Sequence, residues 1–427
     1  MTFVRTLPRF GVNYVPSGDW FYSWLSPRWD TIRRDLDSIA ALGLDHVRVL
    51  PLWPVLQPNR TLIADKALAD VRRVVELAGD AGLDASVDVI QGHLSSFDFV
   101  PSWLSSWHRR NMFTDPESVA AQAALVKAVH TAVADLPGYL GLTLGNEVNQ
   151  FSSPPHPSPM PATPDQISTW LTTLLAAVPS GRGVRLHAEY DAVWYQDGHP
   201  FLPTHASRYG DVTAIHSWIF NGTAQHYGAM SGASIRHAEY LIELSRAFAV
   251  DPARPVWLQE IGAPLNCLDE SDAPEFCRRA VLAAAASDAL WGITWWCSHD
   301  VRRGLADFPE LEYSLGLFDS NGRVKPIGTA FAEVAEHVRA GWRDAAPEPR
   351  TTAVQIPADG DGVPVSRAAL APGGAVFTAW MAAALRGERP ALVLTGAAHR
   401  FEHLLPPVPS DVSGVYSAVS DADAFAL

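Results

Sequence analysis

Short apolar runs alternate with longer stretches of mixed polarity along most of the chain. Several of these runs are almost continuously apolar, which is typical of parallel strands that are buried on both faces. We therefore predict strands at residues 11–15, 45–51, 84–90, 139–146, 184–189, 212–218, 255–260 and 291–297. The stretches between and after them place apolar residues at helical spacing and predict helices at 28–42, 65–81, 116–135, 164–178, 191–208, 231–249, 272–287 and 327–341. Eight βα units in succession predict an α/β fold, a (β/α)8 TIM barrel, rather than an open sheet.

Two long loops interrupt this rhythm. The loop after the third strand, 91–115, carries Trp103 and Trp107, and the loop after the fourth strand, 150–163, is rich in proline. A proline-rich stretch is usually a linker between domains, but this one directly follows a glutamate at a strand end and precedes another βα unit. Both loops leave the C-terminal ends of strands, where barrel enzymes hold their chemistry, so we interpret them as walls beside an active site.

The pattern changes beyond residue 345. There the sequence predicts a strand, an alanine-rich helix at 366–386 and a second strand. An appendage of this size is too short to be a second enzyme. We therefore predict a catalytic barrel at 1–344 and a small C-terminal α/β domain of unknown role at 345–427.

Two glutamates end apolar runs. Glu147 closes the run that begins at Tyr139, and Glu260 closes the run that begins at Pro255. A carboxylate at the end of a buried strand is costly unless it has partners and a task. Two carboxylates in one cleft are the minimum equipment for cleaving a glycosidic bond, one as acid and the other as nucleophile or base. The sequence thus predicts a glycoside hydrolase.

Composition excludes several other classes of protein. The net charge is −14 and no stripe of Lys and Arg could neutralise phosphates, which argues against nucleic acid. The three cysteines have no metal-ligand spacing and give no disulfide framework. We expect no run that approaches the roughly 18 apolar residues of a membrane span, and the N-terminal residues lack the apolar region of a signal peptide. We expect a cytoplasmic protein with no membrane partner, whose oligomeric state the sequence leaves open.

The strand ends resemble those of a known family. They carry the motifs Gly145-Asn146-Glu147, Gln259-Glu260 and Trp295-Trp296, and the segment YSLGLFDSNGRVKP follows the last of them. This ordered set resembles the clan A glycoside hydrolases, and family 5 in particular, which contains cellulases, mannanases and β-mannosidases. The resemblance covers about residues 8–342 and implies a barrel that needs no cofactor and no metal.

The resemblance also implies roles for the residues at the strand ends. Glu147 would be the general acid/base and Glu260 the nucleophile of a retaining, double-displacement mechanism. Asn146 would bond the sugar 2-hydroxyl. Arg48 would lie beneath Glu260 and lower its pKa, whereas the charge of Glu260 and partial burial would raise the pKa of Glu147.

Histidine and tryptophan side chains would complete the sugar site. His93 and His216 match family histidines that line the −1 site, which holds the sugar whose bond is cleaved. Of the adjacent pair, only one tryptophan can face that sugar, and Trp295 is our choice for the platform beneath it. Trp218 stands where the family usually has a tyrosine, and its indole N–H can donate a hydrogen bond but cannot accept one.

Further residues are candidates on their positions alone. Trp20, beside Asp19 after the first strand, and Trp53 after the second are possible sugar contacts. Glu189 ends the fifth strand and is a rival carboxylate, for which we favour a structural ion pair.

We interpret the chain as an exo-acting β-mannosidase that takes small β-linked oligosaccharides, with an endo-β-mannanase or a β-glucosidase as alternatives. A barrel that only binds carbohydrate is the alternative of another class, although binding alone does not need both carboxylates. A metal-dependent hydrolase is a further alternative, but the sequence has no H-x-H at a strand end and no HExxH motif. Activity with and without EDTA distinguishes it.

Overall fold

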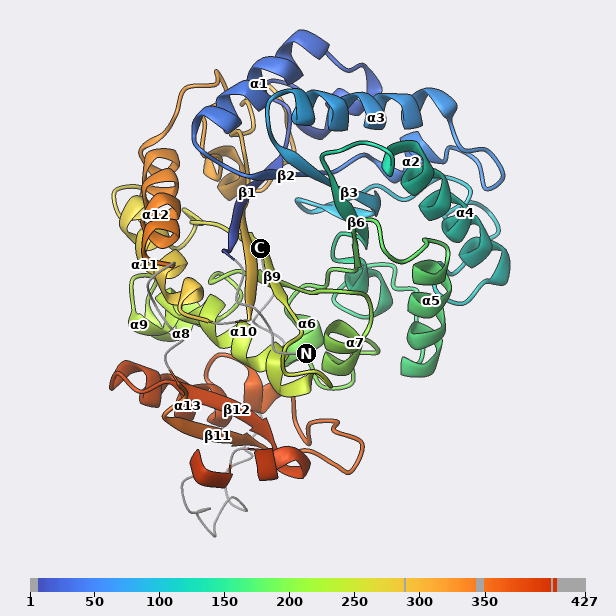
Figure 1. Cartoon of the computed structure of the whole chain (residues 1–427). Helices are drawn as coiled ribbons and strands as arrows, with labels where there is room; N and C mark the ends of the chain where they lie inside the picture. The colour runs from blue at the N-terminus through green and yellow to red at the C-terminus, as the bar shows by residue number, and fades with distance from the viewer. Residues whose placement is uncertain (1–6, 288, 343–348, 401, 405–427) are drawn as a thin grey trace.

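The computed structural model describes residues 7–287, 289–342, 349–400 and 402–404. Eight parallel strands form one nearly closed barrel, with helices around its outside (Figure 1). The strands are β1 Arg9–Tyr14, β2 His46–Val49, β3 Asp84–Ile90, β6 Tyr139–Gly145, β7 Val184–Leu186, β8 Thr213–Ser217, β9 Val256–Ile261 and β10 Leu290–Trp295. Hydrogen bonds join them in the order β7-β6-β3-β2-β1-β10-β9-β8. The predicted (β/α)8 barrel is therefore confirmed, and each strand lies within two or three residues of its predicted range.

The outer helices also follow the prediction. They are α1 Trp29–Ala41, α3 Asp65–Asp80, α4 Pro116–Val133, α5 Pro164–Ala176, α10 His237–Phe248, α11 Ala273–Ala285 and α12 Pro326–Trp342. Two predicted helices are broken into pieces. The range 191–208 holds the short helices α6 Ala192–Tyr195 and α7 Pro203–Arg208, because Gly198 has a positive φ and Pro200 and Pro203 follow it. The range 231–249 begins with a separate turn, α9 Gly232–Ile235.

The two long loops contact each other above the strand ends. The loop after β3 contains a small antiparallel pair, β4 His93–Leu94 and β5 Phe97–Asp98. His156 of the proline-rich loop lies 3.0 Å from Asp98 in that pair, and Asn111 donates to the Pro161 carbonyl at 2.8 Å. The proline-rich segment is thus part of the barrel's upper wall and not a linker.

The C-terminal residues form a parallel βαβ unit that packs on α10 (Figure 1). It consists of β11 Thr352–Ile356, the 3-10 turn η4 Ala368–Leu370, α13 Ala375–Leu385 and β12 Pro390–Leu394. The predicted helix at 366–386 starts later than expected because Pro372, Gly373 and Gly374 interrupt it. Only part of the predicted domain 345–427 lies within the described residues.

One stretch in this unit, Ala368–Leu385, is long and apolar enough to span a membrane by length and composition alone. The expectation that the chain has no such run is therefore wrong. The interruption at Pro372 divides the stretch, and α13 packs Phe377 and Trp380 against Tyr240 of α10, with ring centroids 4.7 and 5.3 Å apart. These contacts make α13 the core helix of the C-terminal unit.

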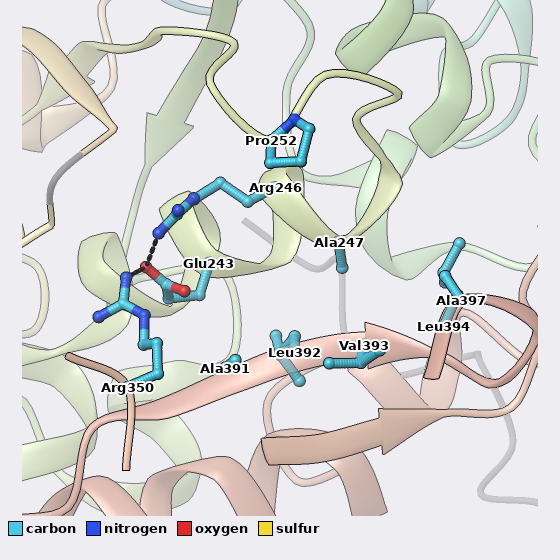
Figure 2. Close-up of a pocket in the computed structure, with 10 residues that line it drawn as sticks. All are labelled: Glu243, Arg246, Ala247, Pro252, Arg350, Ala391, Leu392, Val393, Leu394 and Ala397. Carbon is cyan, nitrogen blue, oxygen red and sulfur yellow. Dashed lines mark hydrogen bonds and ion pairs between the residues drawn. The ribbon is translucent and has the colours of Figure 1, made fainter. Parts of the chain in front are cut away.

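A small cavity lies between α10 and β12, on the outside of the barrel (Figure 2). Arg246 and Arg350 converge there on the carboxylate of Glu243, which is 3.3 Å from Arg246. The cavity is thus part of the interface between the barrel and the C-terminal unit. It is remote from the ends of the strands that carry Glu147 and Glu260.

Candidate active site

The two glutamates meet at the C-terminal face of the barrel. Glu147 is the second residue after β6, and Glu260 is the fifth residue of β9. One carboxylate oxygen of each, together with a ring nitrogen of His216, forms a group of atoms that all lie within 4.8 Å of one another. The carboxyl groups of Glu147 and Glu260 are therefore close neighbours at this end of the barrel. Glu147 has a left-handed backbone with φ 45°, and such strain is concentrated at functional sites.

Arg48 organises the floor of the site from β2. Its guanidinium is fully buried and donates to Glu260 Oε1 at 2.8 Å and to Asn146 Oδ1 at 2.6 Å. It also binds both oxygens of Asp88, at 2.9 and 2.6 Å, and donates to Asn13 at 3.0 Å. All of its nitrogens are therefore used, which fixes Glu260 and Asn146 relative to each other.

His216 on β8 bridges the two carboxylates. Its Nδ1 lies 2.7 Å from Glu147 Oε1 and 3.5 Å from Glu260 Oε2. Gln150 donates to the second oxygen of Glu147 at 2.8 Å. The carboxylate of Glu147 is thus held on both sides, and an imidazole N–H lies between the two acidic groups.

Trp218 takes the place that a tyrosine hydroxyl usually occupies beside the nucleophile. Its indole N–H donates to Glu260 Oε2 at 3.2 Å. Gly262 makes this approach possible, because a Cβ at that position would lie 2.7 Å from the Trp218 ring. Glu260 therefore accepts one hydrogen bond from Arg48 and another from Trp218.

The pKa shifts differ from the sequence expectation. Burial acts to raise the pKa of Glu147, but the hydrogen bond and charge of His216 outweigh it, and this pKa lies below its ordinary value. Burial and the charge of Glu147 raise the pKa of Glu260 despite His216 and Arg48. Arg48 does act to lower the pKa of Glu260, as expected, but burial and the charge of Glu147 outweigh it. The expectation for Glu147 is wrong because it overlooked the bridging histidine.

The choice of Trp295 as the sugar platform is also wrong. The Trp295 ring packs on Phe331 of the outer helix α12 and its N–H donates to the Leu315 carbonyl, so it faces away from the barrel axis. Trp296 packs instead edge-on against Trp20, and its backbone carbonyl lies beside Gly262. Trp296 is therefore the candidate platform.

The other two tryptophans, Trp20 and Trp53, pack inside the protein. Trp53 is fully buried, donates to Gln57 and packs on Trp103. Trp20 is buried and donates to the His299 carbonyl at 2.8 Å. Both indole N–H groups thus have partners within the protein, and the two sugar contacts stay predictions.

Two further candidates occupy defined positions. His93 is partly exposed, and its Nδ1 lies 3.3 Å from Asp98. His93 is one of the groups that lower the pKa of Glu147. Glu189 pairs with His187 in a buried contact behind β7, as the favoured structural interpretation expects. It has no contact with either catalytic candidate.

The trio Glu147, His216 and Glu260 is also the one group among the described residues with the composition of a metal site. Its atoms already have partners, since Arg48 donates to Glu260 and His216 contacts Glu147. The guanidinium, a fixed cation at 2.8 Å, makes a metal ion there electrostatically costly.

Sequence reasoning missed several participants. Asp88, Asn13, Gln150 and Glu312 all contact the residues discussed above. Asp88 had a signal, because a charged residue within an apolar strand needs a buried partner. Glu312 had none, since it lies in a loop far along the chain from both glutamates.

Two neighbouring carboxyl groups are the equipment of glycosidic bond cleavage. Their place at the C-terminal face of a (β/α)8 barrel is that of the clan A glycoside hydrolases. A GH5_18 from Bifidobacterium longum subsp. infantis is 54% identical, with a TM-score of 0.90, over 93% of this chain and 94% of that chain. A GH5_18 from Streptomyces cattleya, solved with GlcNAc, is 52% identical, with a TM-score of 0.91, over 94% and 96%. A Glu-to-Ala variant of a GH5_18 from B. longum subsp. longum, solved with Manβ1-4GlcNAc, is 50% identical, with a TM-score of 0.91, over 97% and 99%.

The chain belongs to the GH5_18 glycoside hydrolases of family 5. No protein-family model and no curated protein sequence matches it. An exo-β-1,4-mannosidase, Op5Man5 from Opitutaceae bacterium strain TAV5, has 23% identity and a TM-score of 0.73 over 92% of this chain and 70% of that one, and shares the fold.

The pH dependence of kcat/KM should follow from the bridging histidine. Burial lowers the pKa of His216, but the charge of Glu260 and the contact with Glu147 outweigh it, so this pKa lies above 6.5. The proton held there is lost as pH rises, so activity should fall on an alkaline limb above 6.5. Glu260 must be ionised, and because its pKa is raised above 4.5, activity should fall with decreasing pH on an acid limb above that value.

A pH series of kcat/KM on an aryl glycoside tests both limbs. Glu312→Gln is the control, because this variant removes another titrating carboxyl and should leave the alkaline limb in place. An alkaline limb below 6.5 in the native enzyme would contradict the assignment of the proton to His216.

Proposed function

We propose that the protein is a retaining, exo-acting β-mannosidase that cleaves short oligosaccharides of the Manβ1-4GlcNAc type. The observation that carries the proposal is the pair of carboxylates, with one oxygen of Glu147 within 4.8 Å of one oxygen of Glu260. The chain is also at least 50% identical to two GH5_18 variants whose structures hold Manβ1-4GlcNAc. Arg48, Asn146 and Trp218 around Glu260 favour a catalyst over a barrel that only binds sugar.

Two displacement steps follow from the proposal. Glu260 attacks the anomeric carbon while Glu147 donates a proton to the departing oxygen, which gives a glycosyl–enzyme ester and the free aglycone. A water molecule then attacks the ester while Glu147 takes a proton from that water, and Glu260 leaves as a carboxylate. In the free enzyme the proton resides at the contact between His216 and Glu147, from which Glu147 receives it when the substrate displaces solvent.

The remaining residues place the sugar. Asn146 has its oxygen engaged by Arg48 and its amide directed to the His93 carbonyl at 3.2 Å, which leaves one amide hydrogen for the 2-hydroxyl. Trp296 is the platform of the −1 site. The orientation of the axial 2-hydroxyl of mannose relative to Asn146 is the feature that selects mannose over glucose.

A panel of p-nitrophenyl β-mannoside, glucoside, galactoside and fucoside, together with Manβ1-4GlcNAc, tests the specificity. The mannoside and the disaccharide should be hydrolysed fastest, with the same rates in EDTA. NMR of the first product should show the β-anomer of the sugar. An α-anomer would contradict retention, and a faster glucoside would favour the β-glucosidase alternative.

Exo action is proposed from the contact between the loops 91–115 and 150–163. A cleft closed by this wall holds a single sugar beyond the scissile bond, so mannohexaose should yield mannose and mannopentaose first. A product time course tests this, and early mannobiose and mannotriose would favour an endo-mannanase. Shortening residues 150–163 should raise activity on long chains.

A small imported substrate also fits the predicted cytoplasmic location, which cell fractionation tests.

A further inference from the structure

A third buried carboxylate lies beside the candidate platform. Glu312 is in the 3-10 turn η3 Glu310–Ser314, within the loop that follows β10. Its side chain is 8% exposed, and its Oε2 accepts a hydrogen bond from the Trp296 indole at 3.2 Å. Glu312 therefore lies directly beside the candidate platform, although the catalytic steps do not use it.

The surroundings of Glu312 do not compensate its charge. Among the described residues no Arg, Lys or His pairs with it, and its one hydrogen bond of normal geometry comes from a neutral indole. Burial raises its pKa to about 7, and the charges of Glu260 and Glu147 act in the same direction. A carboxyl group buried this way is costly unless a further partner satisfies it.

The facing loop presents a second unsatisfied group. Ser95 lies close enough to lower the pKa of Glu312, yet its buried Oγ has no hydrogen bond of normal geometry. Ser95 and Ser96 both have left-handed backbones, with φ values of 51° and 67°. Strained residues of this kind are retained where a site requires them. Glu312 and Ser95 thus face each other beside Trp296, and among the described residues neither has a charged partner.

We propose that Glu312 is a specificity-determining residue that accepts hydrogen bonds from hydroxyls of the terminal sugar remote from its anomeric carbon, at O3, O4 or O6. The anomeric end is held by Glu260, and the 2-hydroxyl by Asn146, so the opposite edge of the ring is the part left to reach Glu312. The inference rests on the proposed glycosidase function. It gives exo action a second basis, because a carboxylate at that edge leaves no room for a further sugar.

Deoxy substrates provide the test. The native enzyme is assayed with the aryl glycoside that it hydrolyses best and with the 3-, 4- and 6-deoxy forms of that sugar. Loss of the hydroxyl that Glu312 binds should lower kcat/KM about 10- to 100-fold, as for other sites that hydrogen-bond a substrate hydroxyl through a charged group. In Glu312→Ala the same deoxygenation should cost less than about 3-fold.

Two further variants separate recognition from support of Trp296. Glu312→Gln keeps an acceptor for the indole N–H but removes the charge, and it should show an intermediate penalty with an unchanged thermal midpoint. Glu310→Gln, an exposed position in the same turn, should behave as native.

Equal penalties in native and Glu312→Ala enzymes for all three deoxy sugars would overturn the proposal. A native enzyme that prefers a sugar other than mannose would contradict the proposed β-mannosidase and still allow this test with that sugar.

Discussion

Glu260→Ala is expected to lower kcat by more than about 10⁴-fold, the largest effect of any single change in the chain. The variant loses the group that attacks the anomeric carbon, and no other described carboxylate is placed to replace it. Azide fills the space of the missing carboxylate and attacks the substrate directly, so added azide should restore turnover and yield the α-glycosyl azide. Product anomers are read by NMR on an activated aryl mannoside.

Glu147→Ala is the matched comparison at the other carboxylate. Its loss removes proton transfer, worth about 10²–10⁴-fold, and substrates with good leaving groups should retain slow activity. Azide then attacks the glycosyl–enzyme ester and should give the β-glycosyl azide. If the two variants gave the opposite anomers, the roles of Glu147 and Glu260 would be reversed.

Arg48→Met is expected to have the largest effect on stability. Removing the guanidinium leaves Asp88 and Glu260 buried without their shared cation, and breaking a buried ion pair in this way costs about 3–5 kcal/mol in the free energy of unfolding. Activity should fall as well, since Glu260 and Asn146 lose their common support. Denaturant unfolding at neutral pH measures the change.

Arg303→Met is the control, because it makes the same substitution at an exposed ion pair. Arg303 pairs with Glu310 on the surface, and its loss should leave unfolding unchanged. At low pH the penalty for Arg48→Met should shrink as Glu260, whose pKa is raised, becomes protonated. A penalty that stays the same at low pH would show that lost packing, and not uncompensated charge, is responsible.

The barrel was predictable because its signals are local. The run that ends at Glu147 and the run that ends at Glu260 each combine a buried strand with one charged residue, and parallel strands of a barrel end on one face. The ion pair of Arg48 with Glu260 was implied by the resemblance to family 5, and the structure contains it. The predicted helix 191–208 is broken in the structure because Gly198, in its middle, has a positive φ that a helix does not allow.

The errors in the site have a common physical cause. Side-chain direction at the end of β10 depends on backbone geometry beyond simple strand alternation, so Trp295 and Trp296 could not be distinguished by position. The pKa directions depend on distances of a few ångströms between His216 and the two glutamates, which residue spacing along the chain does not contain. Glu312 belongs to a loop, and loop positions are set by contacts from distant segments.

Arg367 is a late-synthesised residue that supplies hydrogen bonds to a segment of the barrel made much earlier. Its buried guanidinium donates to the carbonyls of His199 and Phe201, both at 2.7 Å, and lies between the C-terminal unit and the segment that contains α6 and α7. Residue 201 precedes it by 166 positions, which the ribosome covers in about 8 to 33 s at 5–20 residues per second. During that interval these carbonyls lack their donor and the side of α10 that receives Phe377 is uncovered. A nascent chain stalled before residue 367 should therefore expose this side of the barrel to chaperones and proteases, and a shortened gene that ends at the barrel would keep it exposed permanently.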